Sequence, residues 1–149
     1  MKMLPVIVTA IALGLSSALP AHDDATLDKI QAPNGGQLRA AGIYHYELVV
    51  AKDSKDAKEN PIVVYVTDHG ATKIDTKGAT GTITLLAGKT KITVALAPDG
   101  DNRMRAKATY ASDVAMKAVV SITLSGKAAE LARFTPLQRA NVNLSDAGK

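Results

Sequence analysis

Short runs of alternating apolar and polar residues dominate this chain from residue 37 onward. Alternation with a period of two is typical of β-strands that bury one face. The pattern predicts strands over residues 37–40, 43–51, 62–67, 82–87, 90–97, 103–108, 119–125 and 130–134. Only residues 113–118 have a pattern that allows a short helix, so the fold class is all-β.

Glycine-containing turns lie between several of these predicted strands. Ala41-Gly42, Gly88-Lys89 and Gly126-Lys127 predict three hairpins. The charged stretch 52–60, which Pro61 follows, is expected to be an exposed loop. Frequent turns between short strands are typical of two packed sheets. We therefore expect a single antiparallel immunoglobulin-like β-sandwich of seven or eight strands.

The expected domain boundaries follow from these patterns. Residues 37–135 form the sandwich, preceded by a leader and turn over 22–36 and followed by a loosely ordered polar tail over 136–149. Only 3% of the residues are aromatic. The core is therefore expected to consist mainly of Val, Ile, Leu and Ala.

The first 21 residues have the pattern of a secretory signal peptide. A short positive start precedes an apolar run over 4–15 and a small-residue exit. The apolar run is too short to span a membrane. Cleavage is expected after Ala18 or after Ala21, and the second would make His22 the mature N-terminus. We predict a soluble exported protein, located in a bacterial periplasm.

Composition excludes several classes of function. The chain has no cysteine, hence neither a disulfide nor a lipid-anchor cysteine. Loss of Lys2 with the signal lowers the formal charge from +4 to about +3, with no arginine cluster and no Trp, so a nucleic-acid partner is not expected. No nucleophile elbow or phosphate loop occurs, and we predict that the protein is not an enzyme.

Two potential metal ligands, His45 and Glu47, lie two residues apart on one predicted strand. Side chains two residues apart share one face of a strand. An imidazole nitrogen and a carboxylate oxygen can therefore converge on one cation if another element supplies a third ligand. The alternative is an exposed histidine paired with an exposed glutamate.

The remaining candidates lie at a strand end, in the leader and in the strands. His69 follows a predicted strand, where the alternative is a histidine that serves only the turn. His22 would offer its α-amine and its ring to copper if cleavage follows Ala21. Met104 and Met116 are potential Cu(I) ligands, although isolated methionines usually fill cores.

Four segments carry a family resemblance: Pro33-Asn34-Gly35-Gly36, Gly42-Ile43-Tyr44-His45-Tyr46-Glu47-Leu48-Val49, Val64-Tyr65-Val66-Thr67-Asp68-His69-Gly70 and Thr76-Lys77-Gly78-Ala79-Thr80-Gly81. They resemble small exported proteins found alongside bacterial heavy-metal efflux systems, and an accessory domain of the periplasmic adaptor subunits of those pumps. The resemblance implies an exported β-sandwich that binds a transition-metal ion through His45, Glu47 and His69. Relatives commonly have histidine where this chain has Asn34, which weakens the implied site.

The expected function is that of a periplasmic protein that binds copper or zinc and acts as buffer, carrier or sensor for heavy-metal efflux. An efflux-pump periplasmic adaptor is the expected protein partner. The alternative is a metal-free immunoglobulin-like module that docks on an efflux or envelope complex through a sheet face or edge. A copper enzyme with an N-terminal histidine is a third class, without an identifiable oxygen-activation pocket.

Overall fold

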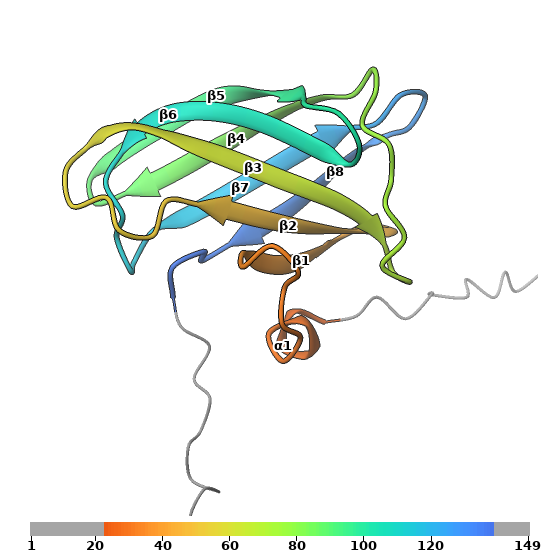
Figure 1. The fold of residues 1–149 in the computed structure, drawn as a ribbon, viewed down its shortest axis with the longest axis horizontal. Coiled ribbons are helices and arrows are strands. Elements are labelled where there is room, and N and C mark those ends of the chain that lie inside the picture. The colour runs from red at the N-terminus through yellow and green to blue at the C-terminus, as the bar shows by residue number, and fades with distance from the viewer. Residues whose placement is uncertain (1–22, 139–149) are drawn as a thin grey trace, which may run out of the picture.

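A computed structural model describes residues 23–138 of the chain as one short helix and one eight-stranded antiparallel sheet (Figure 1). The elements are α1 (Asp24–Leu27), β1 (Gln37–Ala41), β2 (Tyr44–Val50), β3 (Lys58–Asp68), β4 (Thr80–Ala87), β5 (Thr90–Pro98), β6 (Arg103–Tyr110), β7 (Lys117–Thr123) and β8 (Ala129–Phe134). All eight predicted strands are confirmed, as are the three predicted hairpins.

The eight strands form one continuous sheet in the order β1-β2-β3-β6-β5-β4-β7-β8, which curls until it is nearly closed into a barrel (Figure 1). The predicted two-sheet immunoglobulin-like sandwich is therefore wrong. The two halves stay joined because β6 pairs with β3 along its whole length and with β5 at residue pairs Ala97–Arg105 and Pro98–Met104. Alternation and turns indicate the strands but do not indicate whether one strand joins the two halves.

Side chains close the seam between the outermost strands, β1 and β8. The backbone N–H of Thr135 donates to Oε1 of Gln37 over 2.8 Å, and Nε2 of Gln37 donates to Oγ1 of Thr135 over 3.3 Å. The hydroxyl of Tyr46 donates to the carbonyl oxygen of Glu130 on β8 over 3.3 Å. The Gln37 contacts join β1 to the residue after β8, and the Tyr46 contact joins β2 to β8. Within residues 23–138 no ladder pairs β1 with β8.

Alternate residues of the strands fill the interior of the barrel. Most core side chains are aliphatic, as the composition predicts, but the aromatic residues Tyr44, Tyr46, Tyr110 and Phe134 are also buried. On β2 the inward positions are therefore occupied by Tyr44, Tyr46 and Leu48. The intervening residues of β2 point to the outer face of the sheet.

Two local predictions are wrong. Residues 113–115 form a loop and turn, and β7 begins at Lys117. Residues 113–118 are therefore not helical. The loop predicted over 52–60 ends early, because β3 begins at Lys58 and includes Pro61. Proline is tolerated there because the first residues of β3 pair with β6 alone, which leaves one side of the strand without a ladder.

The helix α1 lies in the segment expected to be a leader. The side chain of Asp23 accepts a hydrogen bond from the backbone N–H of Thr26 over 2.8 Å, which is the contact typical of an N-cap. Within the part of the chain that the structure describes, no helix is long and apolar enough to cross a membrane. The predicted signal peptide and His22 lie outside the described residues, as does the tail from residue 139 onward.

The buried phenol of Tyr46 is expected to make the fold less stable at alkaline pH. Burial raises the pKa of Tyr46 above its usual value of 10.0. Smaller contributions come from electrostatic repulsion by Glu130 and by Tyr44. The unfolded chain therefore releases this proton at a lower pH than the folded chain does. The free energy of unfolding should fall above pH 10 by up to about 1.4 kcal/mol per pH unit for this group. Urea denaturation at several pH values checks this, and Tyr46→Phe should show a shallower decline.

Candidate functional site

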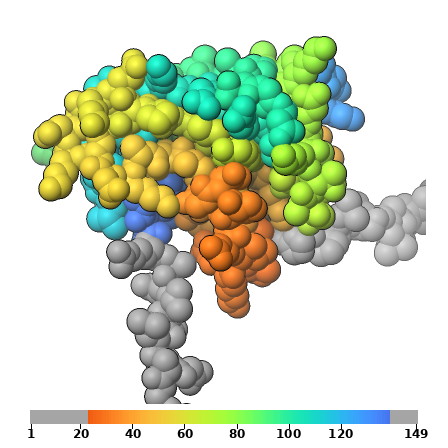
Figure 2. Space-filling model, in the orientation of Figure 1, coloured from red at the N-terminus to blue at the C-terminus, as the bar shows by residue number. Residues whose placement is uncertain are grey.

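A cleft of about 640 Å³ lies outside the barrel, between its wall and the N-terminal segment. We call residues 23–36, which include α1, the N-terminal arm; the arm lies outside the barrel (Figures 1 and 2). We call the cavity the histidine cleft. It is lined by Leu27, Ile30, Gln31, Pro33, Asn34, Leu38, His45, Glu47, Tyr65, Thr67, His69, Ala71, Lys73, Asp101, Asn102 and Arg103.

The cleft brings His45 and His69 together. Their rings stack with centroids 4.6 Å apart and planes inclined by 22°. The sheet register explains the contact, because His45 of β2 is opposite Thr67 of β3 and His69 follows two residues later on the same face. His45 is 7% exposed, whereas His69 is half-buried.

A tight turn after β3 holds His69. The carboxylate of Asp68 accepts hydrogen bonds from the backbone N–H groups of Thr72, over 2.9 Å, and Gly70, over 2.8 Å. These bonds, that of Thr72 above all, hold the pKa of Asp68 below its ordinary value. The backbone around His69 is therefore fixed by its neighbours, and its side chain emerges from a turn at a strand end.

Glu47 lies on the same outer face, but its carboxylate binds the N-terminal arm. Oε1 accepts from the backbone N–H groups of Asn34 over 2.8 Å and Gly36 over 3.0 Å, and Oε2 accepts from Nδ2 of Asn34 over 2.9 Å. Glu47 is only 3% exposed. We call these three bonds the Glu47 latch, because they fasten the arm to β2. Asn34, the residue that departs from the family pattern, supplies two of them.

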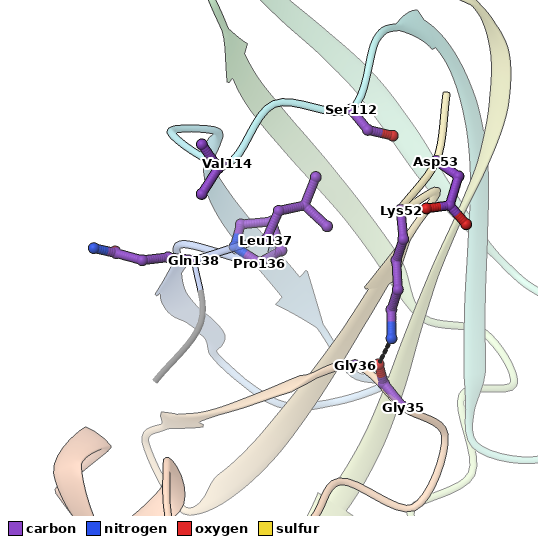
Figure 3. A pocket seen from close by; sticks show the side chains of 9 residues that line it. All are labelled: Gly35, Gly36, Lys52, Asp53, Ser112, Val114, Pro136, Leu137 and Gln138. Carbon is purple, nitrogen blue, oxygen red and sulfur yellow. Dashed lines mark hydrogen bonds between the residues drawn. The ribbon is translucent and has the colours of Figure 1, made fainter. Parts of the chain in front are cut away.

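The glycine pair of the arm is held by a further contact, from Lys52 (Figure 3). Gly35 has a φ of +73°, a left-handed conformation that glycine adopts without strain. Lys52 donates from Nζ to the carbonyl oxygen of Gly35 over 2.7 Å. The preceding Pro33-Asn34 pair favours a turn, and glycine is the residue type suited to this conformation. A second hollow of about 480 Å³ adjoins the turn, and Pro136 and Leu137 line its other side (Figure 3).

Sequence reasoning missed how the arm is attached at its other end. Arg39 of β1, whose side chain is 10% exposed, contacts Asp28 from Nη1 over 2.7 Å and Asp24 from Nε over 3.6 Å. Asp24 and Asp28 are four residues apart, so they lie on one face of a helical turn. That spacing, together with the N-cap pattern at Asp23, was the available signal for a structured arm over the histidine cleft.

The predicted ligands are therefore only partly brought together. His45 and His69 are in contact, and Glu47 lines the same cleft with both oxygens hydrogen-bonded. Among residues 23–138, no group of three His, Asp or Glu side chains is arranged to hold a metal ion. Met104 and Met116 are both 0% exposed in the core, where they pack as apolar residues.

The stacked imidazoles can share one ion only after a change in side-chain torsion. The lone pair of an imidazole nitrogen lies in the plane of its ring. In two rings inclined by 22° and stacked face to face, these lone pairs run side by side instead of meeting at a point. His69 is the less buried of the two rings, so rotation of its side chain is the change we consider.

Comparison with protein-family models gives no match for this chain, and a search of curated proteins also gives none.

Proposed function

We propose that this protein binds one transition-metal cation, copper or zinc, between His45 and His69 in the histidine cleft. The observation that carries the proposal is the contact of two imidazoles, one buried and one half-buried, in an outward-facing cavity. Neutral imidazole is a favourable ligand for both metals. Outside the barrel, an ion can reach these rings without disturbing the core.

Glu47 is assigned a supporting role in this proposal. Its carboxylate stays in the latch and lends its negative charge to the cleft, which favours a cation there. Direct coordination by Glu47 would require hydrogen bonds to Asn34 and Gly36 to break. The two histidines therefore provide the first two ligands.

The physiological role we propose is that of a periplasmic buffer, carrier or sensor for heavy-metal efflux. The support for export is the residue pattern over 1–21, and the support for an efflux partner is the resemblance of four segments to efflux-associated proteins. The proposed protein partner is a periplasmic adaptor subunit of such a pump. If cleavage follows Ala21 and not Ala18, the mature N-terminus at His22 would add a separate pair of nitrogen ligands for copper.

The purified protein is expected to take up about one equivalent of Cu(II) or Zn(II) at the paired histidines. His45→Ala and His69→Ala should each weaken binding by about tenfold or more, because each removes one of two nitrogen ligands. Binding should also weaken in acid, since protonated imidazole does not coordinate. Isothermal titration calorimetry measures all three effects.

The matched control is Tyr65→Phe, which changes another residue lining the cleft and removes no nitrogen. This variant should bind metal as the unmodified protein does. Unchanged heats of binding in the double variant His45→Ala, His69→Ala would contradict the proposal.

The alternative function, a metal-free module docking on an efflux or envelope complex, is favoured by one observation. Leu131 of the outermost strand β8 is 48% exposed, and exposed apolar residues on an edge strand are suited to contact another chain. Elemental analysis of the protein purified from its native compartment separates the two functions. Absence of metal, with no uptake on titration, supports the docking module.

A further inference from the structure

The histidine cleft is much larger than a single ion requires. Its volume of about 640 Å³ lies within the range of roughly 300–1,000 Å³ that is typical of sites for small organic molecules. A bare cation bound by His45 and His69 would leave most of this space to water. The size of the cleft therefore points to a ligand larger than an ion.

The coordination that the protein offers is also incomplete. His45 and His69 supply two nitrogen atoms, and both oxygens of Glu47 are engaged in the latch. Copper and zinc commonly take four ligands or more. At least two positions on the metal must then be filled from outside the described residues.

The walls of the cleft show which donor molecule suits these positions. Leu27, Ile30 and Pro33 of the arm line the cleft with apolar surface, and Tyr65 adds more from β3. Two cationic side chains line the same cavity, Lys73 and Arg103. Lys73 contacts Asp101 over 2.7 Å, and Arg103 donates from Nη2 to the carbonyl oxygen of Asp99 over 3.0 Å.

An anionic donor with an apolar substituent matches this combination. Its carboxylate would coordinate the metal and lie in the field of Arg103, since Asp101 in the same lining offsets the charge of Lys73, and its substituent would be covered by the arm. Arg103 bonds to a neutral backbone carbonyl, and its Nε lies 3.7 Å from Oδ2 of Asp99. The guanidinium charge is therefore only partly offset.

We propose that the histidine cleft takes up its metal as a complex with a small bidentate carboxylate chelator that carries an apolar group. His45 and His69 complete the coordination of that complex, and the arm covers the apolar group. This inference rests on the proposed metal-binding function and specifies the form in which the metal is bound.

Equilibrium dialysis with radiolabelled leucine or glycine tests the inference. Both amino acids chelate Cu(II) through the same amine and carboxylate, and they differ by one apolar side chain. With equimolar Cu(II), the protein should retain about one equivalent of leucine, and without Cu(II) it should retain none. Leucine should be retained about tenfold more tightly than glycine, because its side chain is removed from water.

Two outcomes overturn the inference, and they differ from failure of the proposed function. If the protein retains Cu(II) from the equimolar mixture but retains no amino acid with it, the site takes the ion alone. Equal retention of leucine and glycine shows that the apolar walls take no part. Retention of neither Cu(II) nor amino acid means instead that the metal-binding function itself has failed, and the inference fails with it.

A pair of tryptophan variants locates the apolar contact. Ile30→Trp enlarges a side chain that lines the cleft, and it should bring the ratio of leucine to glycine retention close to one. Ile43→Trp enlarges a side chain that is 60% exposed and does not line the cleft, and it should preserve the ratio. An unchanged ratio in Ile30→Trp would overturn the assignment of the chelator to this cavity.

Discussion

Replacing Gly36 with alanine is expected to lower the free energy of unfolding by about 3 kcal/mol. A Cβ atom at this position would lie 2.4 Å from the carbonyl oxygen and 2.9 Å from the carbonyl carbon of Leu48, within β2. These are backbone atoms of a strand paired on both sides, so they cannot move aside cheaply. The segment at residue 36 would have to move away from β2, and this would displace the N–H of residue 36 from the carboxylate of Glu47. Urea denaturation of the two proteins measures the difference.

Gly88→Ala is the matched control for this prediction. Gly88 has a positive φ of +59° in the turn between β4 and β5, and nothing lies within 4 Å of a Cβ built there. Its replacement should cost about 1 kcal/mol, from backbone strain alone. If Gly36→Ala cost no more than Gly88→Ala, the close approach to Leu48 would not limit this position.

The strands of this protein were predictable because each shows its own alternating pattern of apolar and polar residues, bounded by turn residues. Alternating residues identified β2 and placed His45 and Glu47 on one face, and the turn residues identified the hairpins. Gly35-Gly36 after a Pro-Asn pair indicated a position of positive φ, which Gly35 occupies. Each of these inferences needed only residues that are neighbours in the sequence.

The closure of the sheet was not predictable in the same way. It depends on contacts such as that between Gln37 and Thr135, which are 98 positions apart. It also depends on β6 pairing at its first residues with β5, a link of two residue pairs. No local pattern distinguishes this short link from the break between two sheets, and the sandwich was expected for that reason.

The candidate site shows the same division between local and distant information. Strand periodicity placed His45 on the outer face, but its contact with His69 follows from the register of β2 on β3. The partners of Glu47 are backbone and side-chain donors 11 and 13 positions earlier, in a segment expected to be a leader. An amide from Asn34 occupies the oxygen that sequence reasoning had assigned to a metal ion.

Replacing Glu47 with alanine is expected to release the N-terminal arm and to lower the free energy of unfolding by about 3 kcal/mol. The substitution removes the carboxylate that accepts three charge-assisted hydrogen bonds. Two N–H donors of Asn34 and one of Gly36 lose their acceptor. Amide hydrogen exchange should accelerate at Asn34 and Gly36. Arg39 should still hold Asp28, so the helix end of the arm should be affected less.

Glu47→Gln separates loss of the hydrogen bonds from loss of the charge. The glutamine Oε1 can still accept from the backbone N–H groups of Asn34 and Gly36, and the Asn34 amide can turn its oxygen toward the new Nε2. Stability should therefore fall by only about 1 kcal/mol, with the arm still protected from exchange. If glutamine released the arm as fully as alanine, the negative charge of Glu47, and not its hydrogen-bond geometry, would be what holds the arm over the histidine cleft.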